Sequence, residues 1–289
     1  MCVVCGCTPH DAHHHTDTEA THPKAASGAE SDHLHFGQNP SRQTVAGLSL
    51  HRTIAIEADV LGANSKMAER NREAFAAHGI CAINLLSSPG SGKTTLLCET
   101  LFGLIKTRPE LKLGVIEGDQ ETQFDAQRIR ATGVSAIQVN TGKGCHLDAL
   151  MVSKAFAALH HEFHEHDHGH GHGHAQYPGL LFIENVGNLV CPALWDLGEA
   201  AKVVVLSVTE GEDKPLKYPD MFAAADLMIL NKIDLLPHLR FDVERCLSMA
   251  KAVNPKLEIL QLSATSGQGM TVWLAWLNQR MALQSASAK

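Results

Sequence analysis

The fold of this chain is decided by one stretch, Ser87-Ser88-Pro89-Gly90-Ser91-Gly92-Lys93-Thr94-Thr95. An apolar run at residues 82–86 precedes it, and an apolar-periodic segment at residues 96–101 follows it. This order of strand, glycine-rich loop and helix is the context that a phosphate-binding loop requires. Small residues let successive backbone N–H groups turn toward phosphate oxygens, and the helix adds the positive end of its dipole. The stretch therefore predicts a P-loop, with an ordinary Gly/Ser turn as the simpler alternative.

The residues of this loop have separate expected roles. Lys93 can reach the terminal phosphates of a nucleotide, and the Thr94 hydroxyl can bind a magnesium ion. Ser87 stands where the usual pattern has its first glycine, so backbone freedom has to come from Gly90 and Gly92. The loop residues expected to bind the nucleotide are Gly90, Ser91, Gly92, Lys93, Thr94 and Thr95.

The composition limits the functional class. The chain has 289 residues, 44% of them hydrophobic, which suits one sizeable core with tails. A net charge of −7 without a basic block argues against nucleic acid as a main partner. No apolar run has transmembrane length and the amino end is polar, so we expect a cytoplasmic protein without a membrane partner. In such a protein the eight cysteines are better explained as reduced thiols for metal than as disulfides.

Apolar strand candidates alternate with helical patterns along most of the chain. Continuous apolar strands separated by helices indicate an α/β fold, in which helices cover both faces of a mostly parallel sheet. Ligands of such a sheet bind beyond the carboxyl ends of its strands, which is where the P-loop lies. The expected strands are residues 82–86, 112–116, 136–139, 180–183, 202–208, 227–230 and 257–262.

Two polar segments stand apart from this alternation. Residues 1–50 are rich in Ser, Thr, Asp, His, Gly and Pro, so we expect a disordered, metal-binding tail ahead of a P-loop domain at 51–289. A helix is predicted at residues 54–77, before the first strand. Residues 160–174 carry eight of the 19 histidines, mixed with glycine and acids. We expect a surface insertion there that forms no packed element and binds divalent ions weakly.

The segment Asn231-Lys232-Ile233-Asp234 directly follows a strand candidate. A carboxylate at Asp234 can accept hydrogen bonds from both the ring N–H and the exocyclic amine of guanine. Adenine shows the opposite pattern and would leave that acceptor unpaired. Asn231 can tie this loop to the P-loop, and the stem of Lys232 can lie over the base. Ser263 and Ala264, after the last strand, can complete a pocket for GTP or GDP rather than ATP.

Two acidic residues at strand ends complete the expected nucleotide site. Asp119 can hold Mg²⁺ directly or through water, and Glu184 stands at the end of another strand. Together with Lys93 they are the expected catalytic residues. Gly187, three residues after Glu184, lies where a γ-phosphate can order the backbone. The alternative is that both acids merely cap strand ends.

Three thiols, Cys2, Cys5 and Cys7, fall within the first seven residues. Thiolates bind late transition metals tightly. After removal of Met1, these thiols and the α-amine of Cys2 can support square-planar Ni²⁺, and Zn²⁺ would accept the same donors tetrahedrally. A redox-active or incidental cysteine cluster is the alternative.

A second candidate metal site is scattered along the sequence. Cys145 and His146 are expected to open a helix, whose dipole favours a thiolate, and Cys191 follows the Gly187 loop. Taken singly, each cysteine is more often a small buried hydrophobe than a ligand. Because Cys145 and Cys191 both lie past strand ends, we weigh the metal-site interpretation equally with a packing role. The cysteines expected only to pack are Cys81, Cys98 and Cys246.

Together these motifs resemble the HypB family, the GTPases that assist nickel insertion during NiFe-hydrogenase maturation. The resemblance covers the chain from about residue 54 to its end, plus the first seven residues. The segments that carry it are residues 87–95, Glu117-Gly118-Asp119, Gly144-Cys145-His146-Leu147-Asp148, residues 184–192 and residues 231–234.

The resemblance implies a high-affinity nickel motif in the three amino-terminal thiols and a zinc or nickel site in the Cys145, His146 and Cys191 set. It also implies a homodimer when GTP is bound, and a hydrogenase large subunit or other maturation proteins as nickel acceptor or donor. Because Cys191 lies four residues after Gly187, we expect nucleotide state and metal affinity to be coupled. Two alternatives are a GTPase serving another nickel enzyme, such as urease, and a His-rich nickel storage protein.

Overall fold

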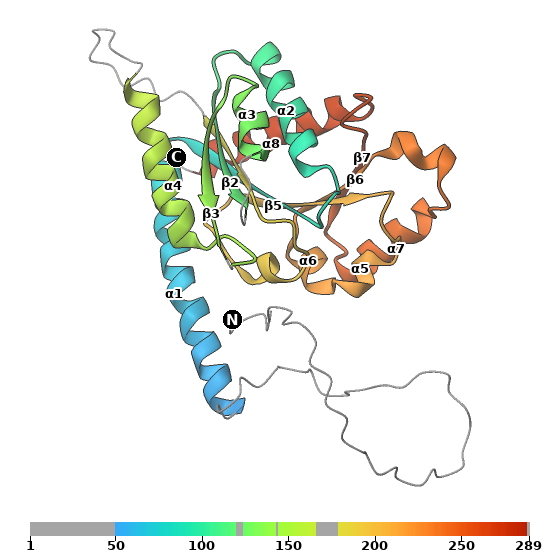
Figure 1. The fold of residues 1–289 in the computed structure, drawn as a ribbon, viewed down its shortest axis with the longest axis horizontal. Helices are drawn as coiled ribbons and strands as arrows, with labels where there is room; N and C mark the ends of the chain where they lie inside the picture. The colour runs from blue at the N-terminus through green and yellow to red at the C-terminus, as the bar shows by residue number, and fades with distance from the viewer. Residues whose placement is uncertain (1–49, 120–123, 143, 166–178, 288–289) are drawn as a thin grey trace, which may run out of the picture. The chain divides into compact units, whose positions relative to one another are not determined.

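The computed structural model describes residues 50–119, 124–142, 144–165 and 179–287 (Figure 1). The chain divides into two compact units, Met1–Asp59 and Val60–Lys289. The described part of the first unit is the beginning of helix α1 (Leu50–Ala77), which confirms the helix predicted before the first strand. The predicted tail lies almost entirely outside the described residues, so its disorder and the domain boundary after residue 50 stay predictions.

The second unit is built on a seven-stranded sheet with the order β3-β2-β4-β1-β5-β6-β7. Every neighbouring pair of strands is parallel, and each predicted strand overlaps an observed one. The predicted α/β architecture is therefore confirmed. The strands are β1 (Ile80–Ser87), β2 (Lys112–Asp119), β3 (Ser135–Asn140), β4 (Gly179–Glu184), β5 (Ala201–Ser207), β6 (Leu227–Asn231) and β7 (Glu258–Gln261).

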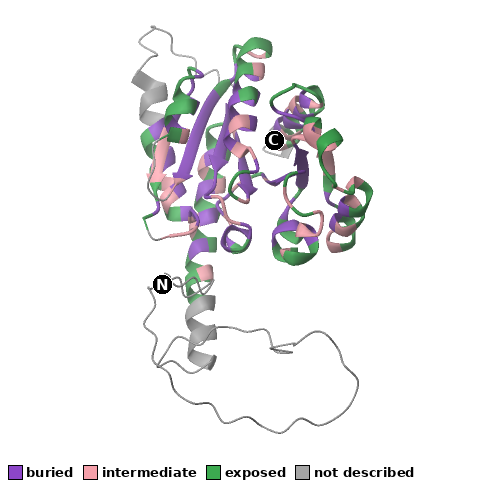
Figure 2. Cartoon of the chain, turned by 45° about the vertical axis from the view of Figure 1, so that its right-hand side comes forward, coloured by how far each residue is buried: buried purple, intermediate pink, exposed green. Residues whose placement is uncertain are grey.

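Helices cover both faces of this sheet (Figure 1). Leu85 and Leu86 are consecutive in β1, and because side chains alternate along a strand they belong to different cores. Leu85 packs with Leu101 and Trp273 of α2 and α8, whereas Leu86 belongs to the core that holds α6 and α7. Strands are largely buried between these layers (Figure 2). The remaining helices are α2 (Lys93–Thr107), α3 (Phe124–Arg130), α4 (Ala149–Glu165), α5 (Lys214–Lys217), α6 (Pro219–Ala224), α7 (Val243–Val253) and α8 (Met270–Ser287), with 3-10 turns η1 (Cys191–Leu194) and η2 (Ile233–His238).

The register of the strands brings distant site residues to one edge of the sheet. Glu117 of β2 is aligned with Glu184 of β4, and Ser207 of β5 with Asn231 of β6. These residues lie at the carboxyl ends of their strands, where ligands of parallel sheets bind. The sheet thus positions the acids, the P-loop and the expected base loop on the same side of the molecule.

One expectation about α4 was wrong. Cys145 and His146 do not open the helix, because α4 begins at Ala149 and both residues lie in the loop before it. Helix α4 continues to Glu165 and so includes the first residues of the histidine segment. The surface insertion at residues 160–174 without a packed element stays a prediction. Residues 166–178 lie outside the described residues.

Among the described residues, none of the helices combines the length and the apolar character that crossing a membrane requires.

Candidate nucleotide and metal site

The loop between β1 and α2 has the backbone geometry that its glycines permit. Gly90 and Gly92 have φ angles of +78° and +91°, in the left-handed region that favours glycine. Gly92 caps α2, and a Cβ atom there would lie 2.8 Å from Nδ2 of Asn231. The loop therefore needs glycine at this position both for its conformation and for the close approach of the β6 end.

The first residues of α2 are bound by a buried carboxylate. Nζ of Lys93 lies 2.8 Å from Oε1 of Glu184, and the hydroxyl of Thr94 donates to the same oxygen at 2.6 Å. Glu184 is 1% exposed, and its other oxygen, Oε2, has no hydrogen-bond partner among the described residues. At the outer end of the loop, Thr95 accepts a hydrogen bond from Arg128 at 3.1 Å. Glu184 therefore binds both Lys93, which is expected to contact the phosphates, and Thr94, which is expected to bind the magnesium ion.

Glu117 is a second buried carboxyl group that the sequence reasoning did not single out as a site residue. It is 2% exposed, lies beside Glu184 in the sheet, and its Oε2 also lacks a partner among the described residues. Burial, together with the nearby charges of Glu184 and Asp119, raises the pKa of Glu117 to about 8. The sequence could have indicated this burial, because side chains alternate along a strand. Glu117 is two residues after the buried Val115 and therefore faces the same side of the sheet.

This donor set suits a magnesium ion. Mg²⁺ prefers carboxylate, hydroxyl and water oxygens. Glu184 and Glu117 each present an unpartnered buried oxygen, and the Thr94 hydroxyl and Asp119, the last residue of β2, lie at the same sheet edge. A divalent cation would favour the ionised form of Glu117 and compensate the charge of the ionised acids.

The expected base-binding residues form a loop that is joined to the P-loop. Asn231 donates to the backbone oxygen of Ser91 at 3.0 Å, and its own oxygen accepts from the backbone N–H of Ala264 at 3.3 Å. Lys232 adopts a left-handed φ of 62° and donates through Nζ to the backbone oxygen of Gly90 at 2.7 Å. The side chain of Asp234 is exposed, and Ser263 is buried. The loop thus presents one open carboxylate next to the P-loop.

The predicted scattered metal ligands do come together. Ligand atoms of Cys145, His146 and Cys191, hereafter the Cys145 cluster, all lie within 4.8 Å of one another. Sγ of Cys145 is 3.6 Å from Nδ1 of His146. Cys191 and His146 are buried, and Cys145 is partly buried. Two sulfurs and one imidazole nitrogen at this spacing suit Zn²⁺ or another late transition metal.

The imidazole of the Cys145 cluster is kept neutral by its surroundings. Burial lowers the pKa of His146, and the charge of Asp148 opposes this only in part. The ring of His146 stacks on Trp195, with centroids 4.3 Å apart and an angle of 30° between the planes. A neutral imidazole is the form that binds metal, so this residue needs no deprotonation at neutral pH.

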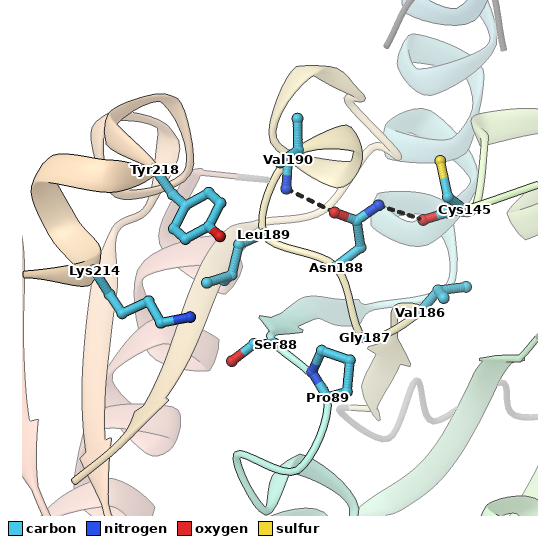
Figure 3. Close-up of a pocket in the computed structure, with 10 residues that line it drawn as sticks. All are labelled: Ser88, Pro89, Cys145, Val186, Gly187, Asn188, Leu189, Val190, Lys214 and Tyr218. Carbon is cyan, nitrogen blue, oxygen red and sulfur yellow. Dashed lines mark hydrogen bonds between the residues drawn. The ribbon is translucent and has the colours of Figure 1, made fainter. Parts of the chain in front are cut away.

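The segment that follows Glu184 contacts both the P-loop and the Cys145 cluster. A Cβ atom on Gly187 would lie 3.2 Å from Cα of Pro89, so the two backbones are close. Asn185 accepts from the backbone N–H of Leu147 at 3.0 Å, and Asn188 donates to the backbone oxygen of Cys145 at 3.4 Å (Figure 3). The two sites are therefore connected by direct contacts.

A cavity of about 340 Å³ opens between these two sites (Figure 3). It is lined by Ser88, Pro89, Cys145, Val186, Gly187, Asn188, Leu189, Val190, Lys214 and Tyr218.

The remaining cysteines divide into two groups. Cys2, Cys5 and Cys7 lie outside the described residues, so their nickel motif stays a prediction. Burial raises the pKa of the Cys81 and Cys246 thiols to about 12. Cys98 is buried as well, and all three lie within regular elements, which agrees with a packing role.

Comparison with known proteins points to one family. Residues 81–261 match the family model described as CobW/HypB/UreG, nucleotide-binding domain. The chain is 55% identical to hydrogenase maturation factor HypB of Cupriavidus necator, across 100% of this chain and 91% of that protein. It is 51% identical to HypB of Escherichia coli K12, across 96% of this chain and 98% of that protein. The crystal structure of Helicobacter pylori HypB in complex with nickel matches with a TM-score of 0.67 and 37% identity, covering 76% of this chain and 95% of that one. The fold is thus the P-loop NTPase fold of these structures.

Proposed function

The chain belongs to the HypB family of hydrogenase maturation factors, and we propose that it is a GTP-hydrolysing nickel metallochaperone. The observation that carries this proposal is the segment from Glu184 to Cys191. Its first residue binds Lys93 of the P-loop, and its last residue belongs to the Cys145 cluster. One short segment therefore joins the nucleotide site to a metal site.

The residues at the P-loop can support phosphoryl transfer to water. Mg²⁺ bound with the nucleotide supplies positive charge at the phosphates, and Thr94, Asp119 and Glu184 would hold it. Lys93 donates to oxygens of the terminal phosphate and stabilises the charge that develops as the bond to the leaving oxygen breaks. Because this chemistry depends on positioning and charge, the rigid connection of strand, loop and helix is well suited to it.

Guanine selection is assigned to the loop after β6. The open carboxylate of Asp234 matches the two donors on the guanine edge, and Asn231 fixes that loop to Ser91 of the P-loop. The proposal therefore includes GTP as substrate and GDP as product.

The contacts of Glu184 support a coupling between nucleotide and metal. Lys93 and Thr94 both bind Glu184. A bound nucleotide and its magnesium ion compete for the same two groups, so binding changes the contacts at the start of the segment that ends in Cys191. Because the two arrangements of this segment would bind metal with different affinity, nucleotide binding would change the metal affinity, and metal binding would change the nucleotide affinity by the same factor. Hydrolysis would then relax the Cys145 cluster and release nickel.

Family membership supports the remaining parts of the proposal. GTP loading assembles a homodimer, and nickel passes to a hydrogenase large subunit or another maturation protein in the cytoplasm. The three amino-terminal thiols provide a second nickel site. Light scattering with GDP and with a non-hydrolysable GTP analogue tests the dimer, and a pull-down from cell extract identifies the acceptor.

Nucleotide turnover tests the enzymatic part most directly. We expect the purified chain to bind GTP in preference to ATP and to release phosphate from it. Lys93→Ala should reduce the turnover at least about 100-fold, because it removes a charge that acts on the transition state. Lys106→Ala changes an exposed lysine on the same helix and serves as the matched control. A metal store without turnover would show no phosphate release in any variant, and this result would contradict the proposal.

A further inference from the structure

The Cys145 cluster is assembled from two separate loops. Cys145 and His146 lie between β3 and α4, and Cys191 begins η1 between β4 and β5. Three donor atoms can share one ion only if these two loops keep a fixed spacing. The two loops are hydrogen-bonded to each other through Asn185 and Asn188. A third element, α1, is in addition hydrogen-bonded to Ala149, which directly follows the first loop, and to the second loop.

Two asparagines of α1 make these bonds, and we call Asn64 and Asn71 the asparagine pair. Asn64 accepts from the backbone N–H of Ala149 at 2.9 Å and donates to the backbone oxygen of Asp196 at 2.7 Å. Asn71 donates to the backbone oxygens of Ala149 at 2.8 Å and Leu197 at 3.0 Å. Each side chain thus bridges the residue that follows the first loop and the end of the second.

The asparagine pair is buried in a closely fitted contact. Asn64 and Asn71 are 8% and 3% exposed, and residues seven apart lie on one face of a helix. Between them, Ala68 meets Gly198 so closely that a Cβ atom on the glycine would lie 2.5 Å from the backbone oxygen of Ala68. Arg72 adds two hydrogen bonds of 3.0 Å to the carboxylate of Asp196. The second loop is therefore fixed against α1 at several points.

This contact reaches the metal ligands through one aromatic ring. Trp195 immediately precedes the bonded Asp196, and its ring stacks on His146 from the other loop. A displacement of the second loop away from α1 would move both this ring and Cys191, four residues earlier, relative to His146.

We propose that Asn64 and Asn71 are positioning residues of the Cys145 cluster, which hold its two loops at the spacing that lets three donors share one metal ion. The inference rests on the metal-binding part of the proposed function and adds residues that touch neither metal nor nucleotide. Partners that orient metal ligands typically change metal affinity by about 10–100-fold when they are replaced.

The test uses Co²⁺ as a probe. The parent protein is the full chain with the substitutions Cys2→Ser, Cys5→Ser and Cys7→Ser. In that background, the thiolate-to-cobalt absorption band reports on the remaining cysteines. Asn64→Ala and Asn71→Ala are compared with Asn254→Ala, the matched control. Asn254 also bridges two segments, donating to the backbone oxygens of Phe222 and Ala225. Thermal stability and GDP affinity are measured for each variant.

We expect both variants of the asparagine pair to lose about 10–100-fold in Co²⁺ affinity, with a weaker thiolate band and unchanged GDP affinity. Asn254→Ala should lose thermal stability but keep the Co²⁺ affinity of the parent. Asn64→Ser leaves a neutral hydroxyl that is too short to bridge Ala149 and Asp196, so it should show the loss of Co²⁺ affinity if the alanine variants do not fold.

Two results would overturn the inference. In the first, the folded Asn64→Ala and Asn71→Ala variants bind Co²⁺ as tightly as the parent, or Asn254→Ala loses as much Co²⁺ affinity as they do. Either outcome would show that the asparagine pair does not position the ligands. A parent without a thiolate band would overturn the proposed metal site, and this inference with it.

Discussion

Two buried carboxyl groups lie side by side at the carboxyl end of the sheet, Glu117 on β2 and Glu184 on β4. In the folded protein the pKa of Glu117 is raised from 4.5 to about 8. Between those values the folded state binds a proton that the unfolded state has released. The free energy of unfolding therefore falls as the pH rises through this window, and it levels off once Glu117 is ionised in both states.

Glu117→Gln should remove this pH dependence, because glutamine has a similar shape and does not ionise. Relative to the wild type, the free energy of unfolding of the variant should increase by up to about 1.4 kcal/mol per pH unit within the window. Urea denaturation without nucleotide or metal, at several pH values, measures the difference. Glu258→Gln, at an exposed ion pair with Arg280, is the control. A difference that does not change with pH would contradict the assignment.

Asp234→Asn tests the guanine interpretation at a single atom. The amide would place a donor opposite one of the two donors of the base, and its remaining oxygen is an uncharged acceptor. The loss of one hydrogen bond and the weakening of the other should reduce GTP binding about 100-fold. Binding of ATP should not weaken, because Asp234 makes no favourable hydrogen bond with adenine. Competition binding measures both, with the exposed Asp220→Asn as control. Equal losses for GTP and ATP would show a general disturbance of the loop instead.

Functional residues that belong to a sequence motif could be predicted from the sequence. Residues whose role depends on partners far away in the chain could not. Lys93, Thr94 and Asp234 stand in patterns whose chemistry is local to the sequence. Asn64 and Asn71 read as ordinary polar positions of a helix, because their partners are backbone atoms more than 70 residues away. Only the folded chain shows that these positions are buried.

At the scale of elements, the strands were predicted well because buried parallel strands are continuous apolar runs. Helix boundaries were less certain. The start of α4 at Ala149 follows from the loop contacts of the residues before it: Leu147 donates to Asn185, and the carboxylate of Asp148 accepts from the backbone N–H of Met151. The bond from Leu147 to Asn185 is long-range, whereas the bond from Met151 to Asp148 is a local helix cap. Only the cap could be predicted from the sequence.

The connection between β1 and α2 can be tested by adding one methyl group. Gly92→Ala should destabilise the protein by more than about 1 kcal/mol, because its φ of +91° is unfavourable for alanine and the new Cβ meets Asn231. Nucleotide affinity should fall as well, since the loop has to shift. Gly62→Ala, in helix α1 with open space around it, should instead stabilise by about 0.5–1 kcal/mol. Thermal unfolding and GDP binding of both variants check this contrast, and equal effects would contradict it.

At the scale of the whole molecule, the nucleotide and metal sites are parts of one contact network. The sequence placed Gly187 and Cys191 close together, which already predicted the coupling. It could not show that Gly187 packs on Pro89, or that Asn185 and Asn188 bind the loop of the Cys145 cluster. Those contacts depend on the strand order, which puts β4 beside β1.

Removing the Cys145 cluster should separate the metal sites of the chain. A variant with Cys145→Ser and Cys191→Ser should lose one thiolate-bound nickel and retain the ions that we expect the amino-terminal thiols and residues 160–174 to bind. Titration with Ni²⁺ beside variants of those two segments measures the contributions. An unchanged number of bound ions in the double variant would show that the cluster does not hold nickel.

The central claim is that the terminal phosphate of GTP controls the Cys145 cluster. The direct measurement is the Ni²⁺ affinity of the chain carrying Cys2→Ser, Cys5→Ser and Cys7→Ser, with GDP and then with a non-hydrolysable GTP analogue. We predict that Ni²⁺ binds about 5–150-fold more tightly with the GTP analogue than with GDP, which is the usual range of coupling between two sites. Equal affinities with both nucleotides bound would contradict the account.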